Sequence, residues 1–132
     1  MLNGDTYLRL DYAAFDAQTR RLGAALGIAL AEVADVARYG AVETRNGRVH
    51  AFAEKGRHGA GYINAGVYRI ERGLFDAFPL SSRFSFETDV MQPMAGHQTI
   101  AAFTDTRDFI DIGVPEDYAR AQQMLRERAS IP

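Results

Sequence analysis

Cysteine is absent from this 132-residue chain, which excludes a disulfide framework and a metal site built on thiolates. The absence also fits a reducing compartment, and we expect the protein to be cytoplasmic. No apolar run approaches the roughly 20 residues that a membrane span needs, and no basic segment followed by an apolar run marks a leader. We therefore expect no membrane partner.

An excess of charge of one sign is also missing. The chain has 15 basic and 17 acidic side chains, so its formal net charge is −2. No basic field favours nucleic acid, and no block of like charge suggests a tail. The composition, with 47% hydrophobic and 24% charged residues, is that of an ordinary globular protein. Without repeats or a linker, residues 1–132 are expected to form a single domain.

Helix signals occur near both ends of the chain. Asp11 is a typical N-cap for a helix over 12–26, with Gly27 as the residue that stops it. Pro115 is typical of a first helical turn, so a last helix is expected to begin there. Its apolar stripe consists of Tyr118, Ala121 and Leu125. Shorter helices are expected over 71–78 and, capped by Ser85, over 85–94.

Strand signals lie between these helices. Asn46-Gly47 is a strong type I′ turn signal and predicts a β-hairpin. The expected strands are 28–33, 39–43, 48–54, 62–70, 98–103 and 109–112, and residues 1–5 read as a strand end followed by a turn. Because helices and strands are mixed along the chain, we predict an α/β fold with an antiparallel portion.

Residues 53–68 concentrate polar groups that could bind a ligand. Glu54 and Lys55 sit where a strand ends, a usual place for ligand groups in α/β proteins. Three glycines follow, which let backbone amides approach a ligand or adopt positive φ. Asn64 and Gly66 interrupt an apolar strand, as if a ligand or another backbone lay against them. The structural alternative is a polar hairpin loop with a charged tip.

Two aspartates are candidate metal ligands. Asp5 and Asp111 each lie at the end of an apolar segment and close to a glycine. Carboxylates at strand ends suit Mg²⁺, which takes hard oxygen ligands and keeps waters and substrate phosphates. The structural alternatives are a turn former for Asp5 and a cap on the approach to a helix for Asp111.

Six short motifs, taken together, carry a family resemblance. In chain order they are Leu2-Asn3-Gly4-Asp5, Arg38-Tyr39-Gly40, Phe52-Ala53-Glu54-Lys55-Gly56, Ile63-Asn64-Ala65-Gly66-Val67-Tyr68, Ser85-Phe86-Glu87-Thr88-Asp89 and Phe109-Ile110-Asp111-Ile112-Gly113-Val114-Pro115-Glu116-Asp117-Tyr118. The series resembles the sugar-1-phosphate nucleotidyltransferases of the glucose-1-phosphate thymidylyltransferase type. Within them it is most similar to the D-glycero-D-manno-heptose 1-phosphate guanylyltransferases and their mannose-1-phosphate guanylyltransferase relatives.

The resemblance implies both a fold and a reaction. The fold is the C-terminal portion of a nucleotide-diphospho-sugar transferase, which is Rossmann-like with a mixed sheet. The reaction joins an NTP, expected to be GTP, to a sugar 1-phosphate of the heptose or mannose type. It yields an NDP-sugar and pyrophosphate. The implied partners are therefore the sugar 1-phosphate and the NTP, and the implied cofactor is Mg²⁺.

The resemblance also assigns roles to individual residues. Asp5 and Asp111 correspond to the family's metal-binding aspartates, and both are expected to be catalytic. Lys55 corresponds to the residue that reaches the sugar phosphate, and it is the third expected catalytic residue. The other expected substrate-binding residues, which hold the sugar hydroxyls or line the sugar pocket, are Gly40, Glu54, Asn64, Gly66 and Glu87.

One departure from the family bears on activity. The family's glycine-rich nucleotide loop and a downstream catalytic lysine both precede the Asn-Gly-Asp turn, and neither is in this sequence. The chain is therefore expected to be a partial domain, inactive alone. The strand ending at Leu2 and the strand 28–33 are expected to expose an apolar edge and favour homo-oligomers. The alternatives are a non-catalytic module for sugar-phosphate binding or subunit interaction and, less supported, an Mg²⁺-dependent phosphohydrolase.

Overall fold

The computed structural model describes residues 1–53 and 55–129, with side chains to residue 127. In chain order its elements are β1 (Thr6–Leu10), α1 (Tyr12–Arg21), β2 (Leu26–Val33), β3 (Val42–Arg45), β4 (Arg48–Phe52), β5 (Gly61–Ile70), η1 (Leu74–Ala77), η2 (Phe86–Met91), α2 (Gln92–Gly96), β6 (Ile100–Phe103), β7 (Thr106–Asp111) and α3 (Pro115–Ala129). The described strands form a five-stranded sheet in the order β3-β4-β6-β2-β5 and a two-stranded β1–β7 ribbon. Because β2 pairs in parallel with β6 and antiparallel with β5, the sheet is mixed, as predicted.

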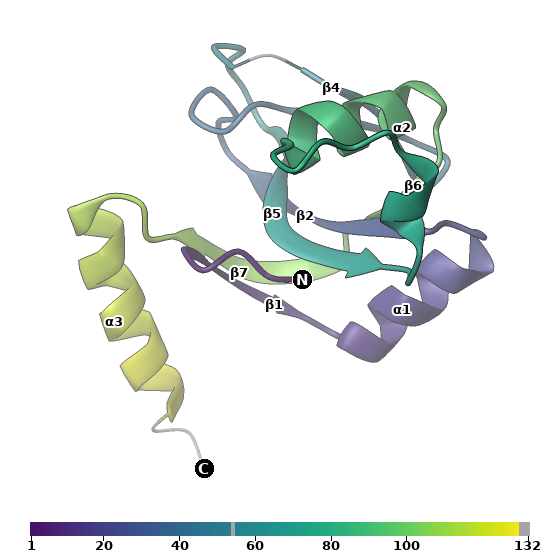
Figure 1. Ribbon diagram of the computed structural model, residues 1–132. Coiled ribbons are helices and arrows are strands. Elements are labelled where there is room, and N and C mark those ends of the chain that lie inside the picture. The colour runs from purple at the N-terminus through teal and green to yellow at the C-terminus, as the bar shows by residue number, and fades with distance from the viewer. Residues whose placement is uncertain (54, 130–132) are drawn as a thin grey trace.

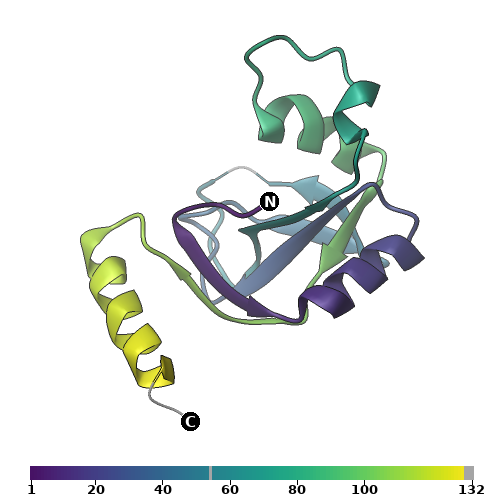
Figure 2. The same ribbon diagram turned by 60° about the horizontal axis from the view of Figure 1, so that its bottom comes forward.

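The sheet separates two layers of apolar packing. Along β2, Leu26, Ile28 and Leu30 face a cluster that includes α2 and η2. Ala29 and Ala31 face the opposite cluster, which includes residues of α1 and the ribbon. This alternation follows from the two-residue period of a strand. Figures 1 and 2 show α2 on one side of the sheet and α1 with the ribbon on the other.

Helix α1 is shorter than predicted. Asp11 caps it as expected, its carboxylate accepting the backbone N–H groups of residues 13 and 14. The helix ends at Arg21 because Gly23 adopts a left-handed φ of 62°, which suits a C-terminal glycine. Gly27, the predicted stop, instead lies inside β2. A Cβ at Gly27 would collide with the Thr19 hydroxyl, so glycine there lets α1 pack closely on the sheet.

The turn and cap signals elsewhere are confirmed. Asn46 and Gly47 have φ values of 51° and 72° and join β3 to β4, as a type I′ turn requires. The Ser85 hydroxyl accepts the backbone N–H of Thr88 at 3.1 Å and caps η2, which continues into α2. The helix expected over 71–78 reduces to the 3₁₀ turn η1.

Strand β1 was not predicted, and its partner β7 was predicted too short. In the ribbon, Thr6 pairs with Asp111 and Leu10 with Thr106. Only Leu8 of β1 is buried, so the strand carries little of the apolar alternation that would mark it in the sequence. Its hydrogen-bonding partner lies about a hundred positions away, where local pattern cannot reveal it.

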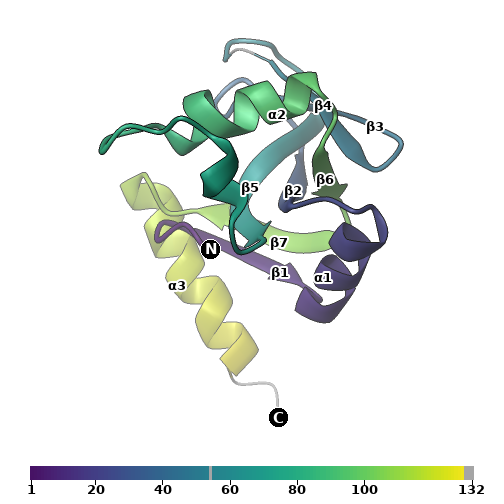
Figure 3. The ribbon, with the colours of Figure 1, turned by 45° about the vertical axis from the view of Figure 1, so that its right-hand side comes forward.

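The predicted position of the open sheet edge was wrong for strand 28–33. β2 lies between β6 and β5, so both of its edges are paired (Figure 3). The outer strand on this side is β5, and the first residues of the chain begin to cover it. Leu2 forms a bridge with Val67, and the backbones of Met1 and Tyr68 exchange hydrogen bonds of 2.9 Å in both directions.

Self-association through the outer side of β5 remains a prediction. Met1, Leu2 and Tyr12 are 56%, 61% and 58% exposed around this strand, and exposed apolar side chains beside a sheet edge favour pairing. We expect the sedimentation coefficient of the chain to rise with its concentration. Leu2→Lys should suppress the rise, since a charge on an edge opposes pairing. A concentration-independent monomer would contradict the prediction.

Helix α3 extends away from the sheet beside the ribbon (Figure 1). Of its predicted apolar stripe, Ala121 is buried, whereas Tyr118 and Leu125 remain exposed. Within the part of the chain that the structure describes, no helix has the length and apolarity needed to cross a membrane.

Candidate functional site

The Asn3-Gly4-Asp5 turn lies directly against β5. The Asn3 backbone N–H donates to the Gly66 carbonyl at 2.8 Å, and the Thr6 hydroxyl donates to the Ala65 carbonyl at 3.2 Å. Gly66 has a φ of 75°, and a Cβ there would lie only 2.8 Å from side-chain atoms of Asn3 and Thr6. The glycine that interrupts the apolar strand therefore makes room for this turn.

The ribbon brings the backbones of the two candidate metal aspartates close together: Asp111 ends β7, and Asp5 lies in the turn just before β1. Asp111 pairs with Thr6, and the Ile112 backbone N–H donates to the Asp5 carbonyl at 2.9 Å. Among the described residues no group of three or more potential ligands exists that could hold a metal ion. Two aspartates whose backbones lie this close nevertheless fit Mg²⁺, which is often held by one or two carboxylates plus substrate phosphates.

Tyr68 is a centre of polar contacts that the sequence did not reveal. Its hydroxyl accepts a hydrogen bond from the Asn64 side-chain amide at 2.9 Å. Burial raises the pKa of this hydroxyl, and hydrogen bonds with Asn64 and Asn3 oppose the rise, whereas the carboxylates of Glu87 and Asp5 add to it. Residues of the turn, of β5 and of η2 therefore surround one buried hydroxyl.

The Tyr68 ring is also a core group, since the residue is 7% exposed and packs edge-on against Phe86 at 5.4 Å. The sequence signal for the Asn64–Tyr68 contact is their spacing, because residues an even number of positions apart share one face of a strand.

Lys55 and Gly40 lie close together at another part of the candidate site. Gly40 has a φ of 86°, and a Cβ there would lie 3.2 Å from the Ala53 carbonyl oxygen and 3.7 Å from Lys55 Cγ. Lys55 is exposed, and no hydrogen bond or ion pair among the described residues joins it to Asn64 or Glu87. The convergence of these groups on one cleft therefore stays a prediction, and Glu54 lies outside the described residues.

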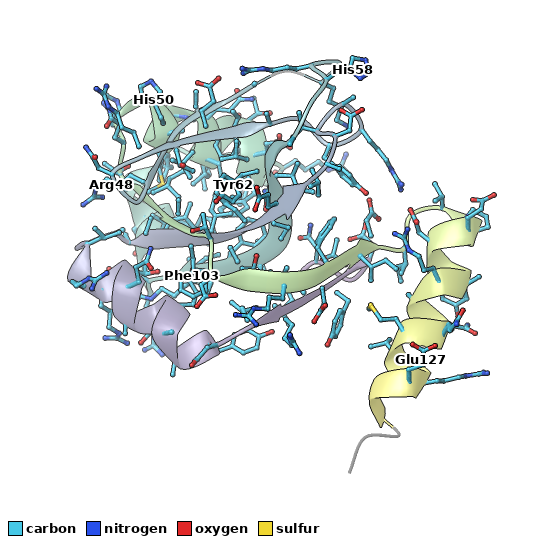
Figure 4. All side chains as sticks on the ribbon, turned by 180° about the vertical axis from the view of Figure 1, so that it is seen from behind. Arg48, His50, His58, Tyr62, Phe103 and Glu127 are labelled. Carbon is cyan, nitrogen blue, oxygen red and sulfur yellow. The ribbon has the colours of Figure 1, made fainter. Side chains whose placement is uncertain are left out.

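Hydrogen bonds connect the glycine-rich loop, residues 56–61, to the segment that follows β2. The Asp35 carboxylate accepts the backbone N–H groups of Ala37 at 3.0 Å and Gly59 at 3.2 Å, and its other oxygen lies 3.2 Å from His58 Nδ1. These contacts, led by the Ala37 amide, hold the pKa of Asp35 below its ordinary value. His58 itself lies at the outer edge of the molecule (Figure 4).

Arg38 links the candidate metal carboxylate to the start of α3. Its guanidinium lies 2.7 Å from Asp117 and 3.5 Å from Asp111, and it sits 5.2 Å from the centre of the Tyr39 ring. The hydrogen bond to Asp117 raises the pKa of Arg38. Because Arg38 and Asp117 are 79 positions apart, no local pattern connects them.

The same residues match a known sequence family. The profile of the family described as "Nucleotidyl transferase" matches residues 1–128, which is nearly the whole chain. The chain belongs to the nucleotidyl transferase family. This confirms the resemblance carried by the six motifs.

Among curated members of the family, the D-glycero-alpha-D-manno-heptose 1-phosphate guanylyltransferase of Aneurinibacillus thermoaerophilus is 39% identical over 126 residues. The match covers 96% of this chain and 55% of that protein. A probable mannose-1-phosphate guanylyltransferase of Arabidopsis thaliana is 36% identical over 108 residues, covering 76% of this chain and 32% of the relative. The chain thus spans about half the length of the first of these relatives and about a third of the second.

A solved structure agrees with the sequence matches. HddC from Yersinia pseudotuberculosis, crystallised with GMP-PN, is 39% identical with a TM-score of 0.76. The alignment covers 94% of this chain and 53% of HddC. The predicted fold class is confirmed: the chain has about half of a nucleotidyltransferase fold, with a mixed sheet.

Proposed function

We propose that this chain forms the sugar-phosphate and metal half of a sugar-1-phosphate guanylyltransferase acting on a heptose or mannose 1-phosphate. The observation that carries the proposal is the ribbon pairing of Asp111 with Thr6, which puts Asp111 next to the Asn3-Gly4-Asp5 turn that borders the polar cluster at Tyr68. The names of the relatives support the choice of guanine and of the sugar.

The reaction would be an exchange of phosphoryl bonds. An oxygen of the sugar 1-phosphate attacks the α-phosphorus of GTP, forming a new P–O bond as the bond to the β-phosphate breaks. Pyrophosphate leaves with the electron pair of that bond, and a GDP-sugar results. Such a step needs positioning and charge neutralisation more than covalent help from the protein.

The chain's own residues would supply specific parts of this chemistry. Asp5 and Asp111 would hold Mg²⁺, which neutralises charge on the phosphates when bound. Lys55 offers a point charge for the sugar phosphate. Asn64 and Glu87 offer hydrogen-bonding groups to sugar hydroxyls. Because glycine has no side chain, Gly40 would leave space for the sugar, and Gly66 leaves space for the Asn3-Gly4-Asp5 turn. The Glu54 carboxylate would accept hydrogen bonds from further sugar hydroxyls.

Lys55→Ala is expected to weaken binding of the sugar 1-phosphate more than binding of the free sugar. The change removes the charge partner of the phosphate but leaves the groups that face hydroxyls. We expect a loss of affinity of about tenfold or more for mannose 1-phosphate, because a hydrogen bond to a charged group contributes about 1.5–3 kcal/mol. Isothermal titration calorimetry with mannose 1-phosphate and with mannose measures the difference.

Arg57→Ala is the matched control, because Arg57 lies in the same loop but pairs with Glu43 at 2.8 Å. Its affinity for mannose 1-phosphate should stay near that of the unchanged chain. Equal losses for the sugar and its phosphate in Lys55→Ala, or equal losses in both variants, would argue against the assignment of Lys55.

A further inference from the structure

The Arg38 guanidinium occupies the side of Asp111 that faces α3. One oxygen of Asp111, Oδ1, accepts the Gly113 backbone N–H at 2.8 Å, and the other, Oδ2, lies 3.5 Å from Arg38. The shorter contact of Arg38 is with Asp117, at 2.7 Å. The guanidinium is therefore held mainly by Asp117, and its other terminal nitrogen forms the longer contact with Asp111.

Other contacts fix the position of Arg38. Its guanidinium carbon lies over the Tyr39 ring, and that ring packs edge-on against Phe109 of β7 at 5.8 Å. Asp117 is 13% exposed at its side chain and is also held by Arg120 at 3.0 Å. An anchored guanidinium loses less conformational freedom when it forms a further charge contact than a free lysine would.

We propose that Arg38 is the built-in counter-cation of Asp111, and that a divalent cation binding at Asp5 and Asp111 must displace Arg38 from Asp111 Oδ2. This inference rests on the proposed function, because it takes Asp5 and Asp111 as the metal ligands. Asp117 keeps the guanidinium in place after the exchange, so the cation would bind without releasing α3 from the loop that carries Gly40.

The charge balance gives the sign of the effect. Without the cation, Arg38 offsets the carboxylate charge of Asp111. With the cation bound, Arg38 adds a second positive charge close to it, which disfavours binding. Removing the charge of Arg38 is therefore expected to tighten cation binding by about three- to tenfold, since charges a few ångströms apart near a protein surface still interact measurably.

The experiment measures binding of Mn²⁺ alone to the 132-residue chain, by the electron paramagnetic resonance signal of free Mn²⁺. Arg38→Gln should bind Mn²⁺ about three- to tenfold more tightly. Arg38→Lys, which keeps the charge, should bind it with nearly unchanged affinity. Arg120→Gln is the matched control, because Arg120 is exposed and contacts Asp117 but forms no ion pair with Asp111 among the described residues. The affinity of the Arg120→Gln variant for Mn²⁺ should not change.

Separate outcomes distinguish this inference from the proposed function. If Asp111→Asn abolishes Mn²⁺ binding but Arg38→Gln leaves it unchanged or weakens it, the role of Arg38 is overturned and the metal site stands. If Mn²⁺ binding persists in Asp5→Asn and Asp111→Asn, the metal site is wrong and Arg38 has no cation to oppose. If neither the unchanged chain nor Arg38→Gln binds Mn²⁺, both are overturned.

Discussion

The 132-residue chain is expected to release no measurable pyrophosphate when supplied with GTP, Mg²⁺ and mannose or heptose 1-phosphate. A nucleotidyltransferase must hold the triphosphate during attack, and backbone amides of a glycine-rich turn normally do so. The glycine-rich loop of this sequence, residues 56–61, lies beside Lys55 and is attached to Asp35. It would serve the sugar phosphate, which leaves no comparable loop for the nucleotide. A coupled pyrophosphate assay measures the result.

A chimera tests whether the expected inactivity reflects the part of the relatives that this chain does not span. The segment of the Aneurinibacillus guanylyltransferase that precedes the matched region would be fused to Met1. The chain covers 55% of that relative, and the fused segment supplies residues of the relative that lie outside this match. We expect the chimera to form GDP-sugar and Asp111→Asn in the chimera to abolish the activity.

Two other outcomes would change the interpretation. If the 132-residue chain alone turned over and Asp111→Asn abolished that activity, the chain would bind the nucleotide without the fused segment. A folded chimera that binds the sugar 1-phosphate but does not react would favour the alternative function, a non-catalytic module for sugar-phosphate binding.

Gly66→Ala is expected to lower the free energy of unfolding by about 2–4 kcal/mol, the combined cost of a left-handed residue other than glycine and of overpacking. Gly66 has a φ of 75°, and the added Cβ would press on side chains of Asn3 and Thr6 at 2.8 Å. The Asn3-Gly4-Asp5 turn would have to move, and Asp5 with it. Urea unfolding measures the stability, and amide chemical shifts of residues 3–6 report the displacement.

Gly96→Ala is the control for this change. A Cβ at Gly96 would meet no atom within 4 Å, and its φ is not positive. The free energy of unfolding should therefore change by less than about 1 kcal/mol. Similar effects of the two substitutions, or unchanged chemical shifts in Gly66→Ala, would show that the turn does not depend on this glycine.

Features that the sequence determined by itself depend on neighbouring residues. The hairpin followed from Asn46-Gly47 because few other dipeptides accept two consecutive positive φ values. The caps at Asp11 and Ser85 followed because a short polar side chain can accept N–H groups two or three positions ahead. The family followed from the order of six motifs, and the profile over residues 1–128 confirms it.

Features that only the tertiary structure decided involve partners far apart in the chain. β1 exists as a strand because β7 supplies its hydrogen bonds, and β2 is an inner strand because β6 pairs with it after a long crossover. The Arg38–Asp117 ion pair joins residues 79 positions apart. Local pattern cannot specify such pairs, because their free energy is gained only once the chain has brought them together. For the same reason Asp5 and Asp111 are far apart in the sequence, whereas in the fold Asp111 pairs with Thr6, the residue after Asp5.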